Sequence, residues 1–89
     1  MMNLKHIRLR INQDNKLMKN VYIKHQPVEL FKLLKFEGLV GSGGEAKHVV
    51  AEGLVKVNGE VEIRKRKKIV AGDVVEFNKE KMLIELELT

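Results

Sequence analysis

The apolar residues of this chain change their spacing at Gly53, and this change limits the folds that are open to it. Before that glycine, Ala46, Val49 and Val50 recur at the three- and four-residue intervals of a helix with one buried face. After it, in "LVKVNGEVEI" (54–63), apolar and polar residues alternate, as they do in strands with one buried face. The sequence therefore predicts an α+β fold.

The dipeptide Asn58-Gly59 divides the alternating stretch into two strands. A two-residue hairpin turn needs positive φ at both positions, and Asn-Gly is the pair that adopts it most readily. Two further strands are predicted in "DVVEFN" (73–78) and "MLIELEL" (82–88), joined by "NKEK" (78–81). The sheet is expected to be small and mainly antiparallel, with four to five strands.

The stretch "QPVELFKLLKFEG" predicts a first short helix. Pro27 is placed in its first turn, where a missing backbone N–H costs nothing. Leu30, Leu33 and Leu34 fall on one face of this helix. Gly38 is expected to end it in the left-handed conformation.

The second helix is predicted to begin at Ser42. With Glu45 three residues later, Ser42 forms the S-x-x-E pattern of a capping box. Gly53 is expected to stop this helix with positive φ. The two helices are expected to be roughly perpendicular and to pack against the sheet.

The first part of the chain is less constrained. "HIRLRI" (6–11) alternates like a strand, "QDN" (13–15) suggests a turn, and "LMKNVYIK" (17–24) is a second candidate strand. We expect either an N-terminal hairpin or a loose extension. The predicted domain organisation is an extension or strand over 1–17 and a single domain over 18–89.

One core is expected between the helices and the sheet, because 89 residues provide for a single modest core. Phe31 and Phe36, on the first helix, are expected to lie in it. Its other predicted members are Leu30, Leu33, Leu34, Leu39, Ala46, Val49, Val50, Val55, Val57 and Val75.

The composition excludes several classes of protein. The chain has no Cys, which excludes a disulfide framework and a thiolate metal site. Its first residues contain no apolar run of the kind found in signal peptides, and no stretch reaches the ~18 apolar residues of a membrane span. We therefore expect a cytoplasmic protein with no membrane partner.

Neither a catalytic nor a metal site is predicted. His6, His25 and His48 lack metal-ligand spacing, and no nucleophile–base pair or pair of carboxylates stands out. The "GSGG" stretch (41–44) lacks the Gly-Lys-Ser/Thr ending of a P-loop. The chain is expected to be no enzyme and to need no cofactor.

Five adjacent cations, residues 64–68, are the most unusual charge feature of the chain. The net charge is +5, and five neighbouring cations repel one another unless an anion answers them. A polyanionic partner is therefore expected, and a solvated surface loop is the alternative interpretation.

The segments "SGGEAKHVVAEGLVKVNG" (42–59) and "AGDVVEF" (71–77) resemble the RNA-binding domain of small-subunit ribosomal protein S4, the alpha-L motif. The resemblance covers about residues 28–77 and is greatest to the small stand-alone bacterial members, which are ribosome-associated. The residues that fall in step with the family pattern are Ser42, Ala46, Val49, Val50, Gly53, Val55, Val57, Asn58, Gly59, Gly72 and Asp73.

The resemblance implies an alpha-L domain over 18–89 that binds structured RNA, in particular ribosomal RNA, and contacts a ribosomal subunit in assembly or translation. Two features of the family pattern are absent. Gly43 replaces an Arg, and Glu29-Leu30-Phe31 replaces the Arg-Leu-Asp that opens the first helix of ribosomal members. The cations of 64–68 are expected to take over their part.

The residues themselves also favour RNA. Glycines at a helix start let phosphate approach the backbone, and Arg and Lys beside them supply charge. With only three Phe and one Tyr, the sheet is not expected to expose an aromatic platform, so structured RNA is favoured over single strands. The alternative is a protein-interaction module that docks an acidic partner through the same patch. We expect a monomer. The predicted RNA-binding residues are Ser42, Gly43, Gly44, Lys47, His48, Lys56, Asn58, Arg64, Lys65, Arg66, Lys67 and Lys68.

Overall fold

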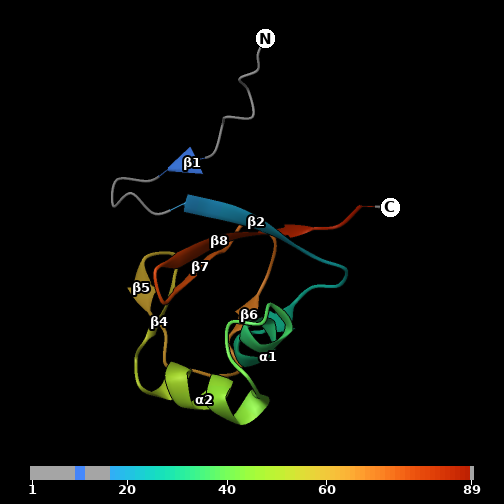
Figure 1. Ribbon diagram of the computed structural model, residues 1–89. Helices are drawn as coiled ribbons and strands as arrows, with labels where there is room; N and C mark the ends of the chain where they lie inside the picture. The colour runs from blue at the N-terminus through green and yellow to red at the C-terminus, as the bar shows by residue number, and fades with distance from the viewer. Residues whose placement is uncertain (1–9, 12–16, 89) are drawn as a thin grey trace.

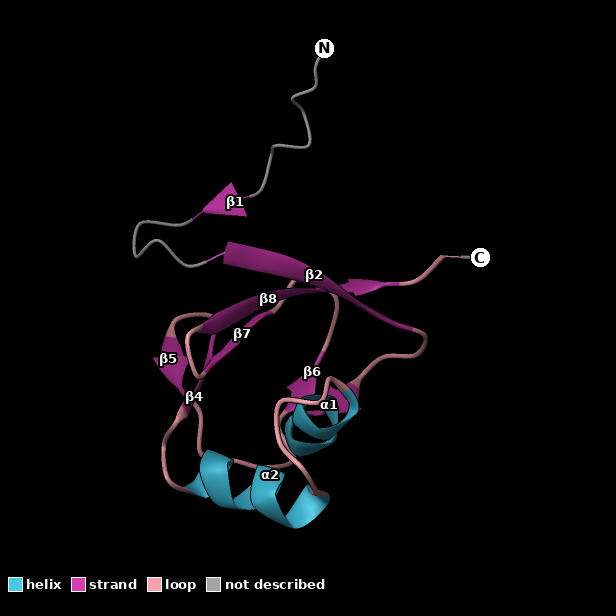
Figure 2. Ribbon diagram, viewed as in Figure 1, coloured by secondary structure: helices cyan, strands magenta, loops and turns pink. Residues whose placement is uncertain are grey.

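A computed structural model describes residues 10–11 and 17–88 of the chain, and these form one layer of helices against one face of a sheet (Figure 1). In Figure 2, α1 is viewed nearly along its axis and α2 lies across the view, as expected for two roughly perpendicular helices. Neither helix has the length and apolar character to cross a membrane. The elements are β1 (Arg10–Ile11), β2 (Leu17–Ile23), β3 (Val28–Glu29), α1 (Leu30–Phe36), α2 (Gly43–Ala51), β4 (Val55–Val57), β5 (Glu60–Val61), β6 (Lys68–Ile69), β7 (Val74–Phe77) and β8 (Glu80–Leu86).

The main sheet has six strands in the order β1-β2-β8-β7-β4-β5. All neighbours are antiparallel except β2 and β8, which run parallel with Val21 opposite Ile84. The α+β class and the mainly antiparallel sheet are confirmed. The expected count of four to five strands was too low, because β1 and β2, from the less constrained first part of the chain, both pair with the sheet.

The N-terminal hairpin is confirmed as far as the structure describes it. Arg10 and Ile11 of β1 pair antiparallel with Met18 and Leu17 of β2. The rest of the candidate strand over 6–11 and the turn over 13–15 lie outside the described residues. The division of the chain at residue 17 stays a prediction.

The segment before α1 differs from the prediction. Pro27 does not lie in the first turn of the helix, which begins at Leu30. Val28 and Glu29 instead form β3, which pairs antiparallel with Ile69 and Lys68 of β6. This small two-stranded sheet determines where the chain enters α1 and where the cationic run ends.

The turns follow the sequence closely. Asn58 and Gly59 join β4 to β5 with φ of 54° and 87°, as the hairpin turn requires. Gly38 and Gly53, which follow the two helices, have φ of 73° and 79°. Both predicted left-handed glycines are confirmed.

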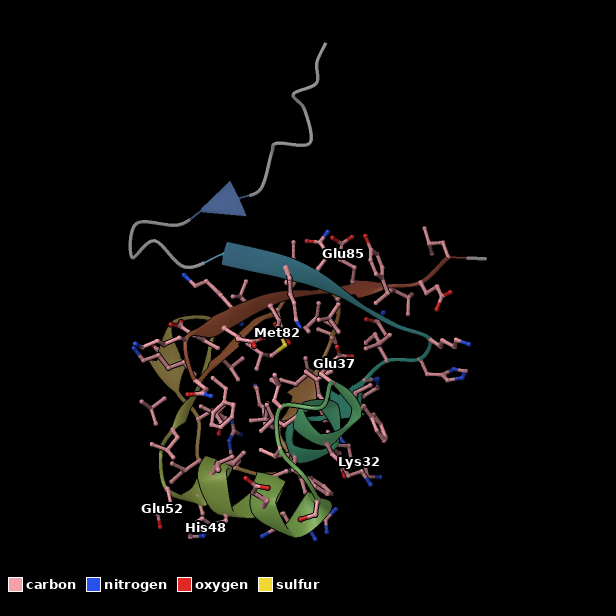
Figure 3. The ribbon with its side chains drawn as sticks, in the orientation of Figure 1. Lys32, Glu37, His48, Glu52, Met82 and Glu85 are labelled. Carbon is pink, nitrogen blue, oxygen red and sulfur yellow. The ribbon has the colours of Figure 1, made fainter. Side chains whose placement is uncertain are left out.

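The core lies between the helices and one face of the sheet. Met82 occupies the centre of this layer in Figure 3, with none of its surface exposed. Of the predicted core, Leu39 is half-buried and Phe36 is 66% exposed, whereas the remaining members are buried. The prediction for Phe36 was wrong. The core also includes Val21, Ile23, Val40, Ile69, Met82 and Ile84.

Candidate nucleic-acid interface

The cationic run is fixed to the start of α1 by its backbone. The carbonyls of Lys67 and Lys65 accept hydrogen bonds from the backbone N–H groups of Leu30 and Phe31, at 2.9 and 3.0 Å. Glu29, the N-cap residue of α1, makes no side-chain cap, so the loop carbonyls take that part. Ile69, directly after the run, is fully buried. The backbone of the run is thus part of the fold, although most of its side chains are exposed.

The ring of Phe31 brings together cations from three segments of the chain. The Nζ atoms of Lys47 on α2 and Lys32 on α1 lie 4.8 and 5.9 Å from its centre. The guanidinium carbon of Arg66 lies 5.4 Å from the same point. These distances are within the ≈ 6 Å range at which an aromatic face attracts a cation. We refer to Lys32, Lys47 and Arg66 as the Phe31 cluster.

The carboxylate of Glu29 lies beside this cluster. Oε1 of Glu29 accepts a hydrogen bond of 3.2 Å from Nη1 of Arg66 and lies 3.6 Å from Nζ of Lys32. One negative charge therefore serves two cations. Lys47 adds a third cation, so the Phe31 cluster and Glu29 together carry a net positive charge.

Arg64 is placed differently, although it belongs to the same run. Its Nε and Nη2 donate to the carboxylate of Glu62 at 2.8 and 2.9 Å, and its backbone N–H donates to the same group at 2.9 Å. The side-chain hydrogen bonds of Arg64, and then its backbone bond, lower the pKa of Glu62 from 4.5 to about 2. The same contact raises the pKa of Arg64. The charge of Arg64 is thus compensated locally.

The first turn of α2 adjoins the Phe31 cluster. Oγ of Ser42 accepts a hydrogen bond of 3.1 Å from the backbone N–H of Glu45, which confirms the predicted cap. The reciprocal bond differs, since Oε1 of Glu45 accepts from Gly41 at 2.8 Å and not from Ser42. A Cβ on Gly43 would lie 3.9 Å from the ring of Phe31, so this turn lies against the ring.

Two predicted site residues, His48 and Lys56, lie away from the Phe31 cluster. His48 is on the exposed side of α2, near the lower edge of the molecule in Figure 3. Lys56 projects from the sheet face opposite the buried Val55 and Val57, across from Glu76.

Asn58 is already engaged by the fold. Its Nδ2 donates to Asp73 at 3.1 Å, and its Oδ1 accepts from the backbone N–H of Val74 at 2.9 Å. These bonds tie the β4–β5 turn to the start of β7. The matching Asn-Gly and Gly-Asp motifs therefore have a structural reason for occurring together.

The remaining cations of the run do not all face the same part of the surface. Lys68 shares a hollow with Lys32, whereas Lys67 shares one with Arg64 and Glu62. Lys65 is exposed. Gly44 is also exposed, in the first turn of α2.

Sequence reasoning missed Lys32 and Phe31 as members of the site. The i, i+3 spacing of Glu29 and Lys32 could have indicated their ion pair. No local pattern joins Arg66 to Glu29, because 37 positions separate them. Tyr22 on β2 is 58% exposed, which places one aromatic ring, but not a platform of several, on the described part of the sheet.

Comparison with known proteins adds independent observations. The S4 domain family matches residues 21–85. The "Putative RNA-binding protein YbcJ" of Escherichia coli (strain K12) is 61% identical over 54 residues, which are 61% of this chain and 77% of that protein. The "Uncharacterized protein YbcJ" of Shigella flexneri matches to the same extent.

Two solved structures share the fold. The solution structure of YbcJ from E. coli, described as revealing an alpha-L motif involved in RNA-binding, aligns with a TM-score of 0.56 at 46% identity. The alignment covers 83% of this chain and 92% of YbcJ. The crystal structure of the 30S ribosomal protein S4e from Thermoplasma acidophilum aligns with a TM-score of 0.55 at 34% identity, over 65% of this chain and 31% of S4e.

Proposed function

The chain belongs to the S4 domain family, and from this premise we propose that it is a non-catalytic RNA-binding protein. Its ligand is structured RNA, in particular ribosomal RNA, and its place of action is the cytoplasm, on a ribosomal subunit during assembly or translation. The binding surface is the Phe31 cluster together with Lys65, Lys68 and the first turn of α2.

The convergence of Lys32, Lys47 and Arg66 on one ring is the observation that carries this proposal. Bringing like charges together is unfavourable unless an anion compensates them, and Glu29 provides only one negative charge. An RNA backbone provides a row of phosphates, which can compensate several neighbouring cations at once. The names of YbcJ and S4e, which refer to RNA binding and to the ribosome, agree with this ligand class.

Each group in the surface suits phosphate in its own way. Arg66 can donate two parallel hydrogen bonds to a phosphate, whereas Lys47 acts as a compact charge. Gly43 and Gly44 open α2 without a Cβ, and the backbone N–H groups of a helix's first turn attract anions. Helical RNA, read through its backbone and shape, matches a surface of this kind.

The test is the salt dependence of RNA affinity. We expect Lys47→Gln with Arg66→Gln to weaken binding of a ribosomal RNA hairpin. The variant neutralises fewer phosphates, so its binding releases fewer counterions. The slope of log affinity against log salt should flatten by roughly 0.7–0.9 for each lost contact. Filter binding at several salt concentrations measures both quantities, and circular dichroism checks that the variant is folded.

Arg64→Gln is the matched control for this experiment. It removes a cation from the same run, but this cation already donates hydrogen bonds to Glu62. Its effect on RNA affinity and on the salt slope should therefore be smaller than that of the Lys47→Gln, Arg66→Gln variant. An unchanged slope in a folded Lys47→Gln, Arg66→Gln variant would contradict the proposed surface. Displacement of the RNA by polyglutamate at equal charge concentration would indicate an acidic protein as the ligand instead.

A further inference from the structure

Phe36 has most of its aromatic side chain exposed to solvent, although it belongs to a helix that packs on the core. It is the last residue of α1 and 66% exposed, whereas Phe31 on the same helix is 7% exposed. Nζ of Lys35 lies 5.5 Å from the centre of the Phe36 ring. An aromatic ring with a lysine beside it, and with most of its surface in water, is available to a ligand.

The ring borders a hollow of about 420 Å³ next to the Phe31 cluster. Pro27, Val28 and Phe36 give this hollow apolar walls, and Lys32 and Lys68 bring two positive charges to it. The carboxylate of Glu29 also lines it, but this group is already held by Lys32 and Arg66. Apolar walls and cationic rims thus meet in one place.

From this combination we propose that Phe36 stacks on an unpaired nucleobase of the bound RNA. The base lies in the hollow, against Phe36, and the phosphates on either side of it contact Lys32, Lys35 and Lys68. The inference rests on the proposed RNA-binding function and adds the class of RNA: a helix with an extruded nucleotide.

Charge complementarity favours a nucleotide over an apolar peptide. A nucleotide within an RNA chain presents the flat ring of its base to Phe36, and a phosphate lies on each side of its sugar. It can therefore stack on the aromatic ring and pair with the lysines at the same time. An apolar peptide segment would cover the ring and leave Lys32, Lys35 and Lys68 without anions. Stacking does not depend on base identity, so any extruded base suits the hollow.

The experiment uses two RNAs that differ in one nucleotide: a fully paired hairpin, and the same hairpin with a single bulged adenosine. Affinities of the full chain for both are measured at several salt concentrations, for the unmodified protein, Phe36→Leu and Phe36→Tyr. We expect the unmodified protein and Phe36→Tyr to prefer the bulged RNA. Phe36→Leu should lose roughly tenfold in affinity for the bulged RNA and little for the paired one.

The salt slope separates stacking from charge. Stacking releases no counterions, so Phe36→Leu should leave the slope unchanged, in contrast to the lysine and arginine variants. Tyr22→Leu is the matched control, because it removes an aromatic ring of similar exposure from the open face of the sheet. Thermal melts verify that both variants fold.

Two results would overturn the inference and are distinguishable from each other. In the first, RNA binding depends on salt as expected, but Phe36→Leu has the same affinity as the unmodified protein for both hairpins. The proposed function then stands and the stacking site does not, and Phe36 would instead be a contact for a protein partner. If neither hairpin binds in a salt-dependent manner, the RNA-binding function itself fails.

Discussion

Arg64 and Arg66 are two positions apart in one loop, but their surroundings differ. The guanidinium of Arg64 donates to Glu62, two residues earlier, at 2.8 and 2.9 Å. Arg66 reaches Glu29, 37 positions away, at 3.2 Å, and lies over the ring of Phe31 beside Lys47. The first contact is local, whereas the second exists only because β3 pairs with β6.

The comparison shows that a count of cations does not give the charge available to a ligand. Arg64 has a carboxylate of its own, so an incoming phosphate must compete with Glu62. Arg66 shares one carboxylate with Lys32, and Lys47 adds further positive charge nearby. The end of the loop is therefore more strongly electropositive than its beginning.

The largest effect is expected from breaking the anchor of the loop's end. Ile69→Ala removes a fully buried side chain from β6 and should destabilise the fold by about 2–5 kcal/mol. RNA affinity should fall as well, since Arg66 and Lys68 lose their placement. Urea denaturation measures the free energy of unfolding.

Ile63→Ala is the matched control for that prediction. Ile63 is 62% exposed in the same segment, so its truncation should change the free energy of unfolding by less than about 0.5 kcal/mol. Equal destabilisation by the two substitutions would mean that the buried end does not anchor the loop.

Removing the partner of Arg64 should make its charge available to RNA. Glu62→Gln removes the carboxylate that holds it, and RNA affinity should rise by about twofold, the size expected of an ion pair at the protein surface in which Arg64 is exposed and Glu62 is half-buried. Glu60→Gln raises the net charge equally, from an exposed position on β5, without freeing Arg64. The same rise in both variants would show that net charge alone is responsible.

The Glu62–Arg64 pair should also give a pH dependence. The pKa of Glu62 is lowered in the folded state from 4.5 to about 2, so its contribution to stability is present above pH 4.5. This contribution is lost as the pH falls from 4.5 towards 2. The stability difference between the unmodified protein and Arg64→Gln should therefore shrink over this range in urea titrations, and a constant difference would contradict the link.

The smallest effect is expected at Lys56. This residue lies on the sheet face turned away from the helices, across from Glu76. Glu85 marks that face of the sheet in Figure 3. Lys56→Gln should leave RNA affinity within about twofold and stability within about 0.5 kcal/mol. A loss as large as that of the Lys47→Gln, Arg66→Gln variant would place RNA on the open face as well.

Much of the fold could be predicted because its signals are local. Asn58-Gly59 specifies a tight hairpin, and Gly38 and Gly53 take up the positive φ that ends each helix. Periodicity identified the buried residues of the two helices, β4 and β7, but it missed Val21, Ile23, Val40, Ile69, Met82 and Ile84. The start of α1 could not be predicted in this way, because Val28 and Glu29 become a strand only through their pairing with β6.

The candidate site was less predictable than the fold. The run of 64–68 is evident in the sequence, and so is a helix start rich in glycine. Which of these cations gather is not, because Lys32, Lys47 and Arg66 belong to three separate segments. Their proximity depends on the hydrogen bonds from α1 to the loop carbonyls of Lys65 and Lys67.

The two phenylalanines of α1 illustrate the difference between what the local sequence determines and what depends on tertiary packing. At ~100° per residue, Phe31 and Phe36 lie on opposite sides of the leucine stripe and about equally far from its centre. Periodicity alone cannot separate them. The sequence determined the helix, its leucine face and the turns, because these depend on neighbouring residues. Only the packing of α2 and the cationic loop against one side of α1 buried Phe31 and left Phe36 in solvent, since burial depends on what the rest of the chain places there.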